Sequence, residues 1–191
     1  TEVVVRATDT FDDLQRKVKC ATILGTIQST YTKFPYLRKV WQRNTEEERL
    51  LGVSLTGIMD NPLMTTKNKG LEKTLAKLRE VAVETNAEWA SRLGVNASVS
   101  ISCVKPSGTV SQFMIDSGIP NEPCVFKGDT TTVFSFPQKS PSNAITRNDM
   151  TAIEQLEMWL IYQRHWCEHK PSVTISVRED EWLEVGAFVY K

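Results

Sequence analysis

The sequence lacks the features that mark several common classes of protein. It carries no net charge, because 23 Lys and Arg residues balance 23 Asp and Glu residues, so composition gives no support for a nucleic-acid or membrane partner. It contains no run of about 18 apolar residues and does not begin with a charged and then apolar segment. We therefore expect neither a membrane span nor a secretory signal, and a cytoplasmic protein.

Cysteine and histidine are also scarce. The chain has four cysteines and two histidines, with no Cys-x-x-Cys pair and no grouping at the spacing of metal ligands. His165, Cys167 and His169 lie close together, but no second cluster accompanies them. We expect reduced or buried thiols at Cys20, Cys103, Cys124 and Cys167. No metal site and no catalytic residue is predicted in this chain.

The first half of the chain alternates strand and helix patterns. Val3 to Val5 is a β-branched run typical of a buried strand, and Thr10 with Asp13 predicts a helix start. Apolar residues then recur at helical spacing before Pro35, namely Leu14, Val18, Ala21, Leu24, Ile27, Tyr31 and Phe34. A strand is predicted over 51–58, and a second helix from Leu71 to Gly94. This alternation predicts an α/β fold with a mainly parallel sheet.

The second half is less regular. Residues 120–148 contain four prolines and predict an irregular surface segment, with a candidate strand over 131–136. Thr151 and Glu154 form a capping box for a helix that runs to about Glu168, with Ile153, Leu156 and Leu160 facing inward. After Pro171 we expect a strand over 172–177.

The most informative stretch is 99–111, Val-Ser-Ile-Ser-Cys-Val-Lys-Pro-Ser-Gly-Thr-Val-Ser. Val99, Ile101 and Cys103 alternate with serines, as in a half-buried strand that Lys105 and Pro106 end. Residues 109–117 can continue as a short helix. Free amides at the first turn of such a helix, together with neighbouring hydroxyls, would favour a bound phosphate.

This stretch has an ordinary structural explanation as well. A strand-to-helix connection whose Ser and Thr side chains merely cap the helix would show the same spacing. The stretch is not a Walker A loop, because it lacks the Gly-x-x-x-x-Gly-Lys-Ser/Thr pattern. Spacing alone leaves the phosphate-binding and capping interpretations open.

The exact residues favour the first interpretation. Residues 105–112, Lys-Pro-Ser-Gly-Thr-Val-Ser-Gln, resemble the substrate-phosphate loop of the adenosylcobalamin-dependent, or class II, ribonucleotide reductases. Residues 21–30, 51–60 and 169–177 resemble other segments of the same family, in the family's order. Together these segments span most of the chain, and the monomeric branch of the family is the most similar.

The resemblance implies a fold and an activity. It implies part of a ten-stranded α/β barrel in which ribonucleoside triphosphates are reduced to deoxyribonucleotides by a thiyl radical that adenosylcobalamin initiates. It also implies thioredoxin as reductant, and a deoxynucleotide effector and the remainder of the same barrel as partners. By resemblance, the substrate-phosphate-binding residues are Ser107, Gly108, Thr109, Val110 and Ser111.

The chain departs from the family pattern in three ways. The Asn-Pro-Cys-x-Glu motif that carries the radical cysteine is absent, as is the cysteine pair of the tail. After Gln112 the sequence resembles a region that the family places later. We expect residues 1–191 to be the carboxyl-side portion of one catalytic barrel domain that lacks a segment after about residue 112, and to have no reductase activity alone.

Two other functions are compatible with the sequence. The chain could be a non-catalytic nucleotide- or phosphate-binding α/β module that lacks the radical machinery. An unrelated phosphotransferase ranks last, because neither a P-loop nor an evident magnesium-binding cluster of acids is present.

Overall fold

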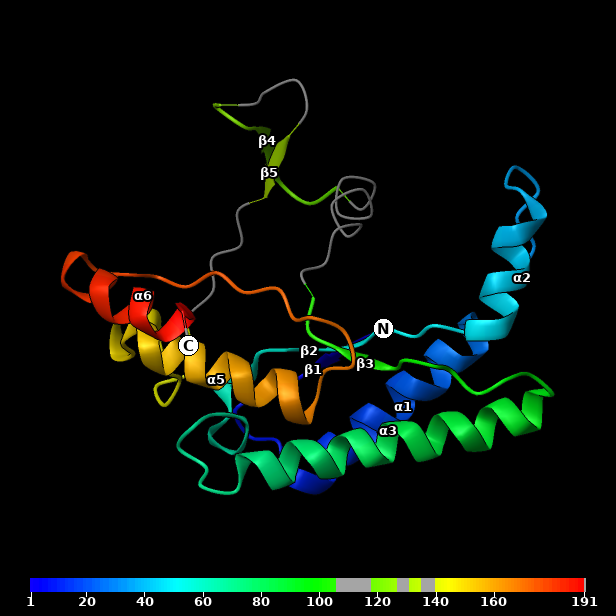
Figure 1. Ribbon diagram of the computed structural model, residues 1–191, viewed down its shortest axis with the longest axis horizontal. Coiled ribbons are helices and arrows are strands. Elements are labelled where there is room, and N and C mark those ends of the chain that lie inside the picture. Colours follow the sequence, from blue (N-terminus) through cyan, green and yellow to red (C-terminus); the bar gives the residue numbers. More distant parts are fainter. Residues whose placement is uncertain (106–117, 127–130, 135–139, 191) are drawn as a thin grey trace. The chain divides into compact units, whose positions relative to one another are not determined.

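The computed structural model describes residues 1–105, 118–126, 131–134 and 140–190 (Figure 1). The chain forms two compact units. The first consists of Thr1–Lys105 and Pro141–Lys191, and the second of Pro106–Ser140. The predicted α/β architecture is found in the first unit.

A parallel sheet of three strands lies in the first unit. Its strands are β1 (Glu2–Val4), β2 (Val53–Thr56) and β3 (Ser102–Cys103), in the order β1-β2-β3. Val3 pairs with Leu55, and Val53 pairs with Ser102. These strands confirm the three that were predicted in this part of the sequence. Strand β1 is shifted by one residue, and β2 and β3 are shorter than expected. The parallel sheet is therefore confirmed.

The third strand differs from its predicted half-buried pattern. Ile101 and Cys103 are buried as expected, but Ser102 is fully buried and Val99 is 70% exposed. Val99 lies before β3, and both residues of the strand, Ser102 and Cys103, are buried. The Ser102 hydroxyl lies in the interior because it donates a hydrogen bond to the carbonyl oxygen of Trp166 (2.5 Å).

Helix α1 (Phe11–Gln28) begins at the predicted capping box. The Thr10 hydroxyl accepts from the Asp13 N–H, and the Asp13 carboxylate accepts from the Thr10 N–H. The helix ends at Gln28, well before Pro35. Its last turns present Leu24 to solvent, contrary to the predicted apolar face, because Gly25 packs against Leu51 instead.

The hydroxyls near the end of α1 bond to neighbouring carbonyl groups. Thr26 donates to the Thr22 carbonyl oxygen, Ser29 to that of Thr26 and Thr30 to that of Ile27, at 2.7–2.8 Å. Thr32 instead donates to a carboxylate oxygen of Glu46 (2.9 Å). These side chains are structural.

Helix α3 (Leu71–Leu93) is the longest helix and packs against both α1 and α5. Its buried face carries Leu75, Leu78 and Ala82, at the predicted helical spacing. It ends at Gly94, which has φ +67° as a glycine after a helix commonly does. The prediction for this helix is confirmed at both ends.

Helix α5 (Ala152–His165) starts at the capping box of Thr151 and Glu154, as predicted. Its inward face differs from the prediction. Met158 and Tyr162 are buried, whereas Ile153, Leu156 and Leu160 are only partly buried. The Tyr162 hydroxyl donates to the Met64 carbonyl oxygen (2.6 Å), a contact that fixes which side of the helix faces the core.

The strand predicted over 172–177 is wrong, because these residues have no regular secondary structure. At Ser176 the backbone is bonded to a side chain rather than to a neighbouring strand. The Ser176 N–H donates to Gln155 Oε1 (3.3 Å), and Gln155 Nε2 donates to the Ser176 carbonyl oxygen (3.4 Å).

The remaining helices of the first unit are peripheral. Helix α2 (Lys39–Glu48) buries none of its residues, and α6 (Trp182–Tyr190) presents Leu183 and Tyr190 to solvent. Short 3-10 helices are η1 (Ile58–Asp60), η2 (Pro62–Met64), η3 (Arg147–Asp149) and η4 (Glu179–Glu181).

In the second unit, β4 (Asn121–Pro123) pairs antiparallel with β5 (Thr132–Phe134). Strand β5 confirms the candidate strand predicted over 131–136, within the residues that the structure describes. The pairing continues by one hydrogen bond, from the Cys124 N–H to the Thr131 carbonyl oxygen (2.9 Å).

Candidate functional site

The carboxyl ends of three parallel strands meet at one edge of the sheet. In α/β proteins this edge is where ligands usually bind. Strand β2 runs into Gly57, which has φ +73° and lies so close to the Val5 carbonyl oxygen that no Cβ would fit. Strand β3 runs into Val104 and Lys105. The segment that resembles a phosphate loop therefore begins where β3 leaves this edge.

Strand β2 and the residues before it bond to one side of β3. The N–H groups of Leu51 and Val53 donate to the carbonyl oxygens of Ser100 and Ile101 (2.9 and 2.8 Å). One step further, the Lys105 N–H donates to Ser54 Oγ (3.2 Å). Contacts with β2 thus continue to the last described residue before Pro106.

The opposite side of β3 is held by the residues that follow α5. The Ser102 N–H donates to a carboxylate oxygen of Glu168 (3.2 Å), and the Glu168 N–H donates to the Ser102 carbonyl oxygen (2.9 Å). The same carboxylate oxygen accepts from the Ile101 N–H. Trp166 Nε1 donates to the Cys103 carbonyl oxygen (2.9 Å).

Glu168 is charged although it is partly buried. Its other carboxylate oxygen pairs with Arg79 Nη2 of α3 (3.0 Å), and its side chain is 16% exposed. Burial raises the pKa of Glu168, but the N–H groups of Ile101 and Ser102 and the Arg79 guanidinium lower it more. The net result is a pKa below the usual value for glutamate, so the carboxylate is ionised at neutral pH.

Two buried thiols flank this region. Burial raises the pKa of Cys103, and it raises the pKa of Cys167 to about 12. The neighbouring Cys103 thiol raises the Cys167 pKa further, and the Val104 backbone lowers it by less. A thiol of such high pKa is a poor nucleophile at neutral pH. These cysteines pack, as expected for residues outside any catalytic motif.

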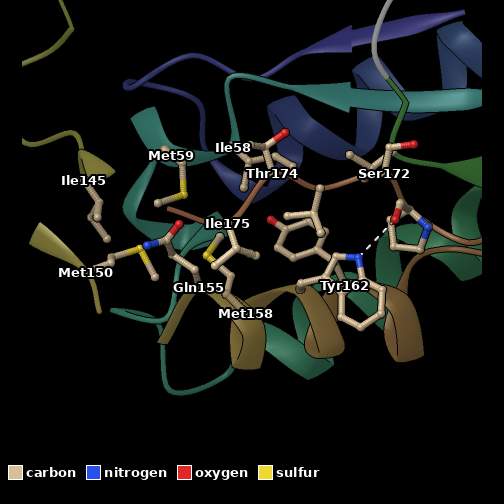
Figure 2. A pocket seen from close by; sticks show the side chains of 14 residues that line it. Ile58, Met59, Ile145, Met150, Gln155, Met158, Tyr162, Ser172, Thr174 and Ile175 are labelled. Carbon is tan, nitrogen blue, oxygen red and sulfur yellow. Dashed lines mark hydrogen bonds between the residues drawn. The ribbon is translucent and has the colours of Figure 1, made fainter. Parts of the chain in front are cut away.

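An apolar cavity of about 320 Å³ lies beside the ends of β2 and β3 (Figure 2). Ile58, Met59, Met158 and Tyr162 line it together with the irregular segment 171–175. Trp159 Nε1 closes one side through its hydrogen bond to the Pro171 carbonyl oxygen (3.0 Å). Sequence reasoning missed this cavity, because residues from five separate parts of the sequence line it.

The five predicted phosphate-binding residues, Ser107, Gly108, Thr109, Val110 and Ser111, lie outside the described residues, as does the short helix predicted over 109–117. What the structure does describe is the strand that leads into them. The sequence analysis missed the roles of Glu168 and Trp166. More than 60 residues separate them from β3. No local pattern signals such a contact.

Neither histidine takes part in a metal site among the residues that the structure describes. His169 Nε2 shares a hydrogen bond with Ser100 Oγ (2.8 Å), and His165 lies 3.8 Å from a carboxylate oxygen of Glu72. Trp166 is fully buried at the end of α5. Over the same described residues, none of the helices has the length and apolarity needed to cross a bilayer.

Comparison with known proteins supports the resemblance. The chain is 24% identical over 204 residues to the adenosylcobalamin-dependent ribonucleoside-triphosphate reductase of Euglena gracilis, and 22% identical over 227 residues to that of Lactobacillus gasseri. The probable enzyme of Dictyostelium discoideum is 25% identical over 203 residues. These matches cover 86–88% of this chain. No family model matches the chain.

The fold gives the same result. A crystal structure of a B12-dependent, class II ribonucleotide reductase matches with a TM-score of 0.68 and 19% identity, over 93% of this chain and 32% of that one. The chain spans only 26–30% of the length of the three curated relatives. In sequence and in α/β fold, the chain is thus similar to one part of the adenosylcobalamin-dependent ribonucleoside-triphosphate reductases.

Proposed function

We propose that this chain is part of an adenosylcobalamin-dependent ribonucleoside-triphosphate reductase, in which it supplies barrel strands and the segment that binds the substrate's phosphates. The observation that carries the proposal is the match to three such enzymes along nearly the whole chain. The described strands support it, because β3 reaches the carboxyl edge of the sheet immediately before that segment.

The phosphate contacts would come from residues 107–111. Backbone N–H groups at 108–111 and the hydroxyls of Ser107 and Thr109 are suitable donors to phosphate oxygens, whereas Val110 can contribute only its N–H. The exposed Lys105 adds a cation two residues before this segment. Holding a charged, unreactive part of the substrate positions the ribose for reaction, which is how remote binding assists catalysis.

The apolar cavity beside the ends of β2 and β3 does not fit the cofactor that the relatives' names carry. A cavity of 320 Å³ accommodates a small ligand and not a corrinoid, and it is lined almost wholly by apolar side chains. In our proposal adenosylcobalamin, the cysteine that bears the thiyl radical and the contacts with thioredoxin and a deoxynucleotide effector therefore belong to other parts of the complete protein.

We also propose that residues 1–191 are the carboxyl-side portion of one barrel domain. The chain spans 26–30% of its curated relatives, and none of its four cysteines lies in a catalytic motif of the family. We accordingly expect the polypeptide 1–191 to reduce no nucleotide when assayed alone with adenosylcobalamin.

The test is reduction of ribonucleoside triphosphates by the complete protein, with and without adenosylcobalamin. Thr109→Glu should raise KM for the substrate at least about tenfold, since a carboxylate among phosphate contacts repels them. Thr66→Glu, at an exposed position outside the predicted segment, is the control. Unchanged KM in the Thr109 variant would contradict the loop assignment.

The same assay separates the two candidate functions. Formation of deoxynucleotide that requires adenosylcobalamin supports the reductase. Tight binding of triphosphate without any turnover would instead identify a nucleotide-binding module that lacks the radical chemistry.

A further inference from the structure

The apolar cavity beside the ends of β2 and β3 has the size of a small-molecule site. Residues of η1, α5 and the irregular segment 171–175 line it, together with Val104, the residue that follows β3 (Figure 2). Its volume of about 320 Å³ is about twice that of a protein cavity of about 150 Å³ that admits benzene. The space therefore suits a ligand of about two fused rings.

The lining of this cavity selects against a charged ligand. Among the described residues that line it, none carries a charge at neutral pH. Tyr162 can ionise, but burial raises its pKa well above the usual value for tyrosine, so its hydroxyl stays neutral. An ion that entered would lose its hydration without gaining an opposite charge. The cavity is therefore suited to a neutral molecule.

The larger polar side chains of the lining are already engaged. The Tyr162 hydroxyl and Trp159 Nε1 each donate to a backbone carbonyl oxygen (2.6 and 3.0 Å). Both polar atoms of the Gln155 amide bond to the backbone of Ser176 (3.3 and 3.4 Å). A ligand with several hydrogen-bonding ring atoms, such as a purine, would have to bury them without partners, which is unfavourable. The ring system of the ligand is therefore apolar.

Sulfur and aromatic side chains in the lining favour a planar aromatic ligand. Three of the five methionines of the chain, Met59, Met150 and Met158, line the cavity with Trp159 and Tyr162. Thioether sulfur makes favourable contacts with aromatic rings, and the unbranched methionine side chain adjusts to the shape of its neighbour. The two aromatic side chains add stacking or edge-to-face contacts. This lining suits a planar ring system better than an aliphatic chain.

We propose that this cavity is a binding site for an uncharged, planar aromatic molecule of about two fused rings. A single polar substituent would face Ser172 or Thr174, whose exposed side chains carry the remaining hydroxyls of the lining. The bound molecule would contact η1, α5 and the segment 171–175 together, and so hold that segment against the helix. The inference does not depend on the function proposed above, because it uses no residue of the predicted phosphate-binding segment.

The experiment measures binding of 2-naphthol to the complete protein by equilibrium dialysis, with 2-naphthoate as the matched probe. The two molecules share one ring system, but only 2-naphthoate is charged at neutral pH. Val173→Asp adds a charge to the lining, and Met59→Trp fills part of the volume. Val99→Asp is the control, because Val99 is also exposed but does not line the cavity. Thermal unfolding monitors the fold of each variant.

We expect 2-naphthol to bind with a Kd of about 100 μM or lower, and 2-naphthoate to bind at least about tenfold more weakly. Saturating 2-naphthol should raise the midpoint of thermal unfolding, since it binds only the folded protein. Val173→Asp and Met59→Trp should each weaken binding of 2-naphthol at least about tenfold. Val99→Asp should bind it as the wild type does. Either lining variant decides the matter should the other not fold.

Three results would overturn the inference. A complete wild-type protein that binds no 2-naphthol would show that the cavity is closed or filled there. Equal binding of the two probes would show that the lining does not select a neutral ligand. Unchanged binding in a folded lining variant would place the probe elsewhere on the protein. None of these results bears on the proposed reductase, whose test is formation of deoxynucleotide.

Discussion

The indole Nε1–H of Trp166 donates a hydrogen bond to the carbonyl oxygen of Cys103 over 2.9 Å, joining residues that are 63 positions apart in the sequence. Both residues are buried, so neither group can bond to water instead. The bond ties the end of α5 to the end of β3, next to the region proposed to bind phosphates.

Removing this bond should destabilise the protein measurably. Trp166→Phe leaves most of the buried ring volume in place but removes the donor, so the buried Cys103 carbonyl oxygen loses a partner. We expect a loss of about 1–3 kcal/mol in the free energy of unfolding, measured with denaturant. Trp182→Phe, at a side chain that is 62% exposed, should change it by less than about 0.5 kcal/mol. Equal losses would contradict the importance of the indole N–H.

Two glycines with similar backbone angles should respond differently to alanine. Gly57 and Gly94 have φ +73° and +67°, so both substitutions strain the backbone by about 1–2 kcal/mol. A Cβ at Gly57 would also collide with the Val5 carbonyl oxygen, whereas nothing lies within 4 Å of the position at Gly94. Gly57→Ala should therefore be the more destabilising, and denaturant unfolding of the two variants measures the difference. Similar losses in the two variants would show that the backbone near Val5 moves away from the added Cβ without a cost in stability.

The low pKa of Glu168 predicts that its contribution to the free energy of unfolding is lost at acid pH. A carboxylate whose folded pKa lies below its unfolded value stabilises the protein above the unfolded pKa, near 4.5, and loses that contribution as the pH falls through the folded pKa. Denaturant unfolding of the wild type and of Glu168→Gln should thus differ most at neutral pH and converge below about pH 4. A constant difference across this range would contradict ionisation of the partly buried carboxylate.

The thiol of Cys167 should affect stability at alkaline pH. Its folded pKa of about 12 exceeds the ordinary thiol value, so folding favours the protonated form. That contribution is complete below about pH 8.5 and is lost as the pH rises toward 12. The alkaline decline in unfolding free energy should be shallower in Cys167→Ala than in the wild type. An identical alkaline decline in the two proteins would mean that burial does not keep the Cys167 thiol protonated.

The same pKa predicts how the cysteines react. At pH 8 only about one Cys167 thiol in 10⁴ would be ionised in the folded protein. Cys20 is exposed and should be alkylated by iodoacetamide in the native protein, whereas Cys103 and Cys167 should react only after unfolding. Mass spectrometry of the labelled peptides reports each site. Rapid labelling of Cys167 in the native state would contradict the buried position.

Local signals in the sequence predicted the elements of the first unit well. The capping boxes at Thr10 and Thr151 and the glycine at position 94 act within a single helical turn, so they are readable without knowledge of the fold. The β-branched run around Val3 likewise marked a buried strand. The family resemblance, drawn from four short segments, was confirmed by the comparisons.

Predictions that depended on tertiary contacts fared less well. Ser172 to Val177 had the composition of a strand, but Gln155 and the walls of the apolar cavity determine its conformation. Leu24 followed the helical spacing, yet the close contact of Gly25 with Leu51 turned another face of α1 to the core. Glu168 lies 66 positions from its partner, Ser102, so no local periodicity in the sequence predicts their contact.

The contacts at Ser102 also bear on how the protein avoids self-association. An exposed sheet edge with free N–H and carbonyl groups can recruit an extended peptide from another molecule and so start aggregation. At Ser102 both outward groups are already engaged by Glu168, and a charged side chain stands at the position that an incoming peptide would take. The carboxylate thus makes this end of the sheet a poor template for intermolecular strand addition.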